Sequence, residues 1–154
     1  MKRLCVLAIV LGLAITTAPV RADSDDHSVT AAASGLFADG SEIGPVALAG
    51  VDIATGVFIE ADGTASGTFH AMLQGSSLGG NPQEITVEGN VTGGSVDADG
   101  RATFTGSASL DMGDGAPPLV NVTFSVSAGS DDLVLVVDSI TLTASLSAGA
   151  VIID

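Results

Sequence analysis

The sequence has very little cysteine, aromatic side chain or positive charge. Its single cysteine, Cys5, lies near the N-terminus, and among 154 residues it has five Phe but neither Trp nor Tyr. Because the segment around Cys5 is expected to be removed, as argued below, disulfides are excluded from the mature chain. With so few aromatic side chains, the core must be built mainly from Val, Ile, Leu and Ala.

Positive charge is confined to four residues. Lys2, Arg3 and Arg21 lie in the N-terminal segment, which leaves Arg101 as the only Lys or Arg beyond it. All 18 acidic residues follow position 22, so the mature side chains carry one positive and 18 negative charges, a net charge of −17. Nucleic acids and anionic membrane surfaces are bound by clusters of cations. The composition therefore excludes nucleic acids as partners and disfavours an anionic membrane surface.

The first 22 residues have the pattern of a secretory signal peptide. Lys2 and Arg3 precede an apolar run over residues 4–18, and Val20 and Ala22 stand three and one residues before a cleavage point. About 15 apolar residues are few for a membrane crossing, which needs roughly 20. We expect cleavage after Ala22, no membrane span after cleavage, and a secreted, periplasmic or cell-surface location.

The mature chain is predicted to be one domain without long helices. Residues 23–28 are acidic and lack apolar periodicity, which predicts a disordered tail. Residues 29–154 have the length of a single domain. Nowhere in them do apolar residues recur at helical spacing over three turns without a glycine. The 20 glycines of the sequence also disfavour long helices.

Short alternations of apolar and polar residues predict strands instead. The clearest covers residues 102–110, and the same pattern recurs at 64–73, 85–92, 119–128 and 140–146. A period of two puts the apolar side chains on one face of a strand. Residues 133–137 are continuously apolar, which predicts a strand covered on both faces and followed by a tight turn or bulge at 138–139. The predicted core contains Phe69, Phe104, Val122, Phe124, Leu135, Leu142 and Leu146.

Asp-Gly pairs mark the turns. They occur at residues 39–40, 62–63, 99–100 and 114–115, and Asp-Gly is typical of the type I′ turns of hairpins. The pattern predicts that 57–60 pair with 64–73 and 95–97 with 102–110, with loops at 75–83 and 112–118. Roughly eight to ten strands result, which predicts a single antiparallel β-sandwich or up-and-down β-barrel. A transmembrane barrel is disfavoured because the outward positions are polar and aromatic girdles are missing.

Acidic residues near the turns are the candidate metal ligands. Asp97, Asp99, Asp111 and Asp114 lie at the ends of predicted strands, where carboxylates from adjacent loops could supply the six to eight oxygen ligands of Ca²⁺. The competing interpretation is that Asp is simply a favoured turn residue. A weakly bound Ca²⁺ is the one cofactor that the sequence suggests.

Histidine offers little for catalysis. His27 lies in the predicted tail, and His70 lies on the polar side of a predicted strand with Ser66 and Thr68. A hydrolase using His70 or an acidic pair is an alternative function. The Trp and Tyr platforms common in sugar-cleaving enzymes are missing. The sequence therefore favours a non-enzymatic role.

Rows of hydroxyl groups are the most distinctive predicted surface. Thr103, Thr105, Ser107 and Ser109 share one face of a strand, and similar rows occur at 121–127 and 141–147. Aligned in one sheet, such rows would bind ordered water, a glycan or a protein, or would simply face solvent. The predicted function is that of a secreted or cell-surface β domain with a structural, adhesive or binding role. A further alternative is a β-barrel that holds a small apolar ligand in its interior.

Overall fold

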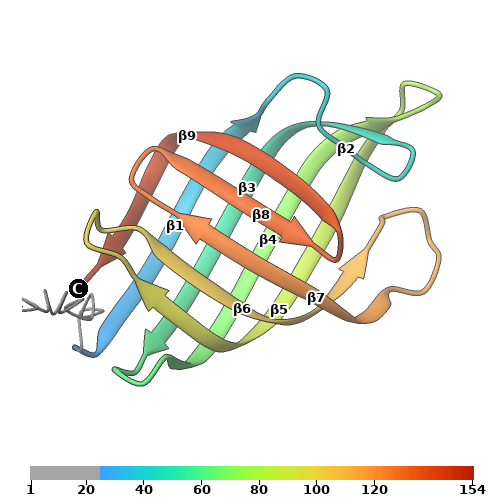
Figure 1. Ribbon diagram of the computed structural model, residues 1–154. Coiled ribbons are helices and arrows are strands. Elements are labelled where there is room, and N and C mark those ends of the chain that lie inside the picture. The colour runs from blue at the N-terminus through green and yellow to red at the C-terminus, as the bar shows by residue number, and fades with distance from the viewer. Residues whose placement is uncertain (1–24) are drawn as a thin grey trace, which may run out of the picture.

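The computed structural model describes residues 25–154. The predicted signal peptide, residues 1–22, and the first two residues of the predicted tail lie outside this range. The last two residues of that tail, His27 and Ser28, belong to the first strand. Ser28 exchanges two backbone hydrogen bonds with Asp154, of 2.9 and 3.0 Å, so the two ends of the described chain lie side by side (Figure 1).

Nine antiparallel strands and no helix make up the described chain. The strands are β1 (His27–Phe37), β2 (Glu42–Ile43), β3 (Val46–Ile59), β4 (Thr64–Ser77), β5 (Pro82–Val96), β6 (Ala102–Asp111), β7 (Leu119–Ala128), β8 (Asp132–Val137) and β9 (Ile140–Ile153). Consecutive strands pair from β2 to β9, β9 pairs with β1, and β1 pairs with β3. The sheet is therefore a closed eight-stranded barrel, with β2 as a short addition beside β3.

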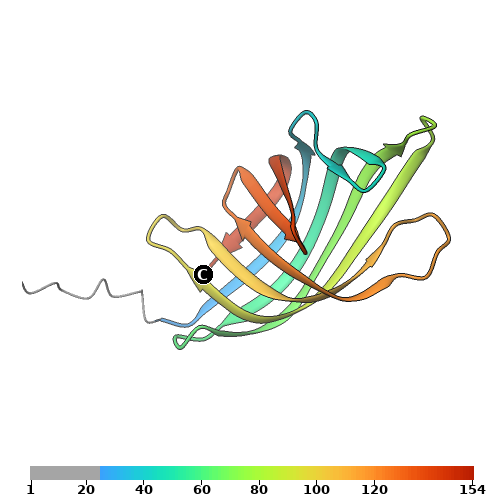
Figure 2. The same ribbon diagram turned by 45° about the vertical axis from the view of Figure 1, so that its right-hand side comes forward.

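The barrel wall is strongly curled. β6, β7 and β8 cross in front of β3, β4 and β5 at a steep angle (Figure 1), and the turned view shows the curl of the sheet between them (Figure 2). The register shifts between Val91 and Gly93 in the pairing of β5 with β6, and between Ser34 and Gly35 in that of β1 with β9. Bulges and strand glycines increase local twist, which lets a sheet bend enough to close.

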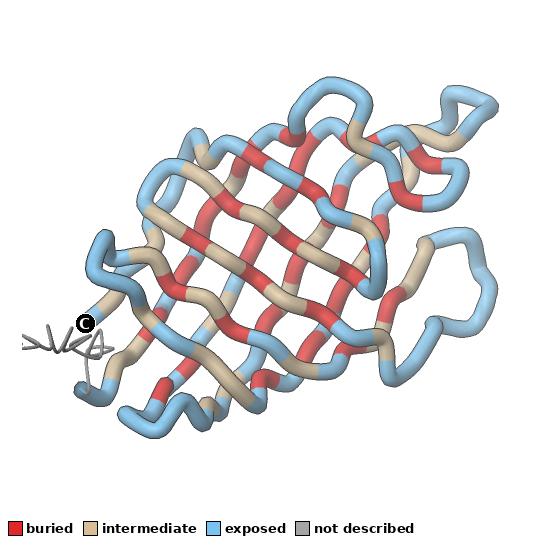
Figure 3. Tube along the Cα trace, viewed as in Figure 1, coloured by how far each residue is buried: buried red, intermediate tan, exposed pale blue. Residues whose placement is uncertain are grey.

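The interior is apolar. Buried residues alternate with exposed or half-buried ones along most strands (Figure 3). The buried hydrophobic side chains form one continuous cluster, and none of the described polar or charged residues is buried. The ring centroid of Phe69 lies 5.9 Å from that of Phe104 and 5.5 Å from that of Phe124. Removal of this apolar surface from water is the main stabilising contribution to such a fold.

Most of the predicted core is confirmed, with a correction at β8. Phe69, Phe104, Phe124, Leu135 and Leu142 are buried, whereas Val122 and Leu146 are only partly buried. The prediction that β8 is covered on both faces is wrong, because only its alternate residues are buried. Its two outward valines lie half-buried on the outer wall. The continuous apolar run follows from the high β-propensity of valine and not from a second covering layer.

The Asp-Gly turns form the predicted hairpins by a different geometry. A type I′ turn needs positive φ at both central residues, but among the two hairpin turns only Gly63 and Gly100 have it, at 87° and 74°. The N–H of Gly63 donates to the carbonyl of Glu60, and the N–H of Glu60 donates to that of Thr64. This is a three-residue loop in which a type I turn is followed by a left-handed glycine. The aspartates therefore keep ordinary φ values.

Loop lengths agree in part with the sequence. The loop predicted at 112–118 is confirmed, whereas the one predicted at 75–83 shrinks to residues 78–81 because both flanking strands extend into it. The turn predicted at 138–139 is a two-residue connection in which Asp138 has a φ of 56°.

Within residues 25–154, no helix is long and apolar enough to cross a membrane.

Candidate functional site

A polar cleft lies on the outer wall of the barrel over β4, β5 and β6. Its volume is about 510 Å³. Its lining residues are Thr68, Phe69 and His70 of β4, Glu88, Gly89 and Asn90 of β5, Ser107, Ala108 and Ser109 of β6, and Val120 and Asn121 of β7. Most of these side chains carry hydrogen-bonding groups, and they come from four consecutive strands.

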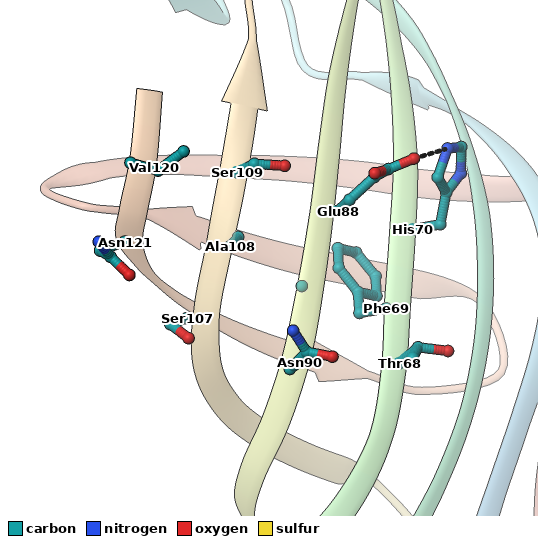
Figure 4. Close-up of a pocket in the computed structure, with 11 residues that line it drawn as sticks. Thr68, Phe69, His70, Glu88, Asn90, Ser107, Ala108, Ser109, Val120 and Asn121 are labelled. Atoms are coloured by element: carbon teal, nitrogen blue, oxygen red, sulfur yellow. Dashed lines mark ion pairs between the residues drawn. The ribbon is translucent and has the colours of Figure 1, made fainter. Parts of the chain in front are cut away.

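Strand register sets the polar side chains in two rows. His70 pairs with Glu88, and Glu88 pairs with Ser109. In the same way Thr68 pairs with Asn90, and Asn90 pairs with Ser107. Cross-strand partners lie side by side on one face of a sheet, and Figure 4 shows the two rows running across the strands. The two rows together form the floor of the cleft.

A bulge in β7 forms one wall of the cleft. Ala108 pairs with Val122 and Leu110 with Leu119, so two residues of β7 stand opposite Ser109 alone. Asn121 takes a left-handed conformation with a φ of 59°, which asparagine tolerates better than most residues. Val120 is consequently 69% exposed, although the alternation of residues 119–128 predicts it to point inward. Bulges redirect side chains in this way.

Glycine on the inner side keeps the cleft floor close to an aromatic ring. A Cβ on Gly89 would lie 2.7 Å from Cζ of Phe124, and one on Gly106 would lie 2.9 Å from Cε1 of the same ring. The ring stacks on Phe69 with an interplanar angle of 16°. The chain can therefore bring β5 and β6 over Phe124 only because both positions lack a side chain.

His70 and Glu88 form the one ion pair of the cleft. Their Nε2 and Oε1 atoms lie 3.8 Å apart, and their side chains are 43% and 65% exposed (Figure 4). Two serines also line the cleft. Ser107 belongs to the other row, and Glu88 stands between His70 and Ser109 in the register. Two strand spacings separate the histidine from that serine, roughly 10 Å. A Ser-His-acid triad needs the histidine between the other two groups, so this row does not have that order.

The predicted alignment of hydroxyl rows is confirmed for β6 and β7. Thr103, Thr105 and Ser107 pair with Ser127, Ser125 and Thr123, respectively. The hydroxyl row of β9 is separated from these two by β8 and its outward valines. The hydroxyl surface of the barrel is therefore continuous over β6 and β7 and joins the cleft at Ser107.

The predicted metal ligands lie in two separate places. Asp97 and Asp99 precede the start of β6, and Asp111 and Asp114 lie at and beyond its end. Ten residues of extended chain separate the two pairs, roughly 30 Å. Three of the four carboxylates accept backbone hydrogen bonds in their own turns: Asp97 from Asp99 and Arg101, Asp111 from Gly113, and Asp114 from Ala116.

These hydrogen bonds explain why aspartate occupies the turns, whether or not a metal binds. Within residues 25–154, no three His, Cys, Asp or Glu side chains are grouped closely enough to hold a metal ion. Calcium binding at Asp97, Asp99, Asp111 and Asp114 stays a prediction.

Arg101 is held by a neighbouring carboxylate at one end of the barrel. One terminal nitrogen of its guanidinium contacts the two carboxylate oxygens of Asp132 at 2.5 and 2.6 Å, and the other donates to the hydroxyl of Ser127 at 3.2 Å. The hydrogen bond with Asp132 raises the pKa of Arg101 above its ordinary value. A cavity of about 650 Å³ opens beside this pair and is also lined by His27. The cation is thus paired at one end of the barrel, away from the residues that line the outer cleft.

The fold and this site define a closed eight-stranded antiparallel barrel with an apolar interior and a polar cleft on its outer wall. No protein-family model, curated protein or solved structure matches the chain.

Proposed function

We propose that the chain is an exported, non-enzymatic binding module that holds its ligand in the outer cleft over β4, β5 and β6. The observation that carries the proposal is the convergence of an imidazole, a carboxylate, two amides and several hydroxyls on one cavity of about 510 Å³. Ligand sites typically enclose about 300–1,000 Å³ and use a few polar groups to orient the ligand. The outer cleft has a volume in this range, and its polar groups come from four strands.

The distribution of polarity supports a protein that works in water outside the cytoplasm. The outward residues of the cleft are Thr, His, Glu, Asn and Ser, whereas the interior is built from Val, Leu, Ile, Ala and Phe. A transmembrane barrel has the opposite arrangement, with a lipid-facing apolar band. The N-terminal pattern supports export, and the strong negative charge keeps an exported protein soluble.

Interior packing favours the outer cleft over an interior ligand site. The ring centroid of Phe69 lies within 6 Å of the ring centroids of Phe104 and Phe124. All three residues are at most 3% exposed. They belong to the single cluster that spans the barrel. An interior apolar ligand would have to displace these contacts, whereas the outer cleft is already open.

Chemical-shift mapping tests the proposed site. The ¹⁵N-labelled exported protein is titrated with glucose, N-acetylglucosamine and glycerol as separate probes. We expect the largest amide shifts at Glu88, Asn90 and Ser107 for at least one probe, and we expect Asn90→Ala to weaken that binding several-fold. Asn81→Ala, in the exposed loop between β4 and β5, is the matched control and should leave binding unchanged. Shifts centred on interior residues such as Leu135, or absent for every probe, would contradict the proposal.

The non-enzymatic part of the proposal has its own test. The register places Glu88 between His70 and Ser109, so we expect His70→Ala to leave the slow hydrolysis of 4-nitrophenyl acetate unchanged. If the unmodified protein hydrolyses the ester clearly faster than buffer alone and His70→Ala loses that activity, the cleft is catalytic.

A further inference from the structure

The outer cleft continues into a second cavity. This second cavity has a volume of about 510 Å³ and is lined by residues of β5, β6, β7 and β8 and by the turn residue Asp138. Ser107 lines both cavities. On the neighbouring strand β5, the outward residue Asn90 lines the outer cleft and the outward residue Thr92 lines the second cavity. The two cavities therefore adjoin along β6 and form one groove across five strands.

We propose that this groove binds a linear, uncharged oligosaccharide that spans both cavities. The inference rests on the proposed function and adds the class and the length of the ligand. Neighbouring strands lie about 4.8 Å apart, so a groove from β4 to β8 extends roughly 20 Å. A single sugar would fill only part of such a groove, whereas an extended chain of sugars would follow it.

The charge of the protein favours an uncharged ligand. The groove contains the carboxylates of Glu88 and Asp138, and Arg101, the one Lys or Arg beyond the N-terminal segment, pairs with Asp132 elsewhere. A strongly negative surface repels acidic polymers. Acidic glycans and nucleic acids are therefore disfavoured, and neutral glycans are not.

The lining chemistry matches ligand hydroxyls. The second cavity contributes Thr92, Thr105, Thr123 and Ser125 in addition to the shared Ser107. Serine and threonine hydroxyls donate and accept hydrogen bonds at the same atom, and asparagine amides do both through two atoms. Sugar hydroxyls have the same dual character. A peptide, by contrast, is commonly bound by strand addition at a free sheet edge, and the barrel wall is closed.

The missing aromatic platform makes ligand length decisive. Without Trp or Tyr, a bound sugar ring gains little from stacking, and its apolar contacts come from Val120 and Val136. Each hydrogen bond adds only about 1 kcal/mol net, less than a tenfold gain in affinity. Contacts from both cavities must therefore add along one ligand before binding becomes strong.

A chain-length series with one variant in each cavity tests the proposal. The exported protein is titrated by calorimetry with uncharged di-, tetra- and hexasaccharides from three series: β-1,4-linked glucose, β-1,4-linked N-acetylglucosamine and α-1,4-linked glucose. In at least one series we expect the Kd to fall by at least about tenfold from the di- to the hexasaccharide. Asn90→Ala and Thr123→Ala should each raise the hexasaccharide Kd several-fold. Thr143→Ala, an exposed outer-wall threonine of β9 outside both cavities, is the matched control for Thr123→Ala and should change nothing.

The outcomes separate this inference from the proposed function. Binding that stops improving at the disaccharide and ignores Thr123→Ala overturns the extended groove but leaves a one-cavity binding module. Tighter binding of an acidic glycan such as oligogalacturonate than of every neutral series overturns the ligand class. No binding in any series overturns the inference, and the proposed function then falls only if the mapping experiment with the small probes also shows no site in the outer cleft.

Discussion

At the scale of single residues, the packing of Phe124 depends on positions that have no side chain. Gly89 and Gly106 both face its ring, and a Cβ at Gly106 would also collide with the carbonyl oxygen of Asn90. Because protein interiors are packed nearly as densely as organic crystals, such contacts cannot be relieved locally. The ring in turn stacks on Phe69. These residues hold the inner side of the cleft floor.

Replacement of Gly89 should therefore be costly. Gly89→Val should lower the free energy of unfolding by roughly 1–3 kcal/mol, the usual cost of overpacking a core. Gly56→Ala on β3 is the control, since its added Cβ meets no atom within 4 Å and its φ is not positive. There we expect no loss and a gain of up to about 1 kcal/mol, because alanine restricts the unfolded chain. Urea unfolding of both variants measures the difference, and equal stabilities would contradict the packing argument.

Removal of the ring itself should cost more. Phe124→Ala should destabilise the protein by about 3–5 kcal/mol through the cavity it leaves. Phe58→Ala, at a phenylalanine that is 45% exposed, should cost clearly less. The same urea experiment applies. If Phe58→Ala lowered the free energy of unfolding as much as Phe124→Ala, the outer face over β3 would be covered by something other than solvent.

At the scale of strands and turns, the register of the hairpins creates the site. The sequence places His70 correctly on the polar face of its strand. Its pairing with Glu88 can be predicted only if the position of the turn between β4 and β5 is known. Hairpin register follows from that turn. Because the loop is predicted at 75–83 but lies at 78–81, the predicted loop does not identify Glu88 as the partner of His70. The inward position predicted for Val120 fails for a similar reason, because alternation is lost at a bulge. Asn121, a residue type that tolerates positive φ, was the only local signal.

Alternation is a reliable guide where long-range pairing is regular. It predicts the strands, most of the core and the aligned hydroxyls of β6 and β7 because a period of two depends only on the local chain. Barrel closure depends on the pairing of β1 with both β3 and β9, and the pairing with β9 brings together residues more than 100 positions apart. No local pattern encodes that contact, so the sequence leaves sandwich and barrel open.

The turn between β3 and β4 predicts a pH effect. The carboxylate of Asp62 accepts hydrogen bonds from the hydroxyl and the backbone N–H of Thr64, which lower the pKa of Asp62 below its ordinary value of 3.8. A lowered folded-state pKa adds stability above 3.8 that is lost as the pH falls through the folded value. Asp62→Ala should therefore reduce stability at neutral pH, and the difference from the unmodified protein should shrink below about pH 3.8.

Asp99 provides the comparison for that turn. It occupies the matching place in the Ala-Asp-Gly loop between β5 and β6, but there Asp97 accepts the hydrogen bonds, one of them from the N–H of Asp99. Asp99→Ala should cost less than Asp62→Ala at neutral pH. Chemical denaturation across the pH range measures both, and an Asp62 effect that persists undiminished at pH 2 would rule out the carboxylate as its source.

At the scale of the whole molecule, negative charge gathers at the two ends of the barrel. Asp62, Asp97, Asp99 and Asp131 lie at or near turns at one end, and Asp39, Asp111, Asp114 and Asp138 at or near turns at the other. The wall between them carries few charges, Asp52 and Glu88 among them. Like charges brought together by folding repel one another and destabilise the compact state. A single Arg-Asp pair at one end offsets little of that repulsion.

Salt should therefore stabilise the protein, because counterions screen charges that lie on exposed turns. Between about 10 mM and 1 M NaCl the Debye length falls from about 30 to 3 Å, so repulsion within each end of the barrel is largely removed. We expect the thermal midpoint to rise by several degrees, since 1 kcal/mol corresponds to roughly 2–8 °C for domains near this size. A midpoint that stays constant or falls would contradict the argument.

Millimolar CaCl₂ measured against NaCl of equal ionic strength separates screening from the predicted calcium site. A gain specific to calcium that is lost in Asp97→Asn or in Asp114→Asn would locate that site at one end of the barrel. An equal response to the two salts means that the turn carboxylates act only through their charge.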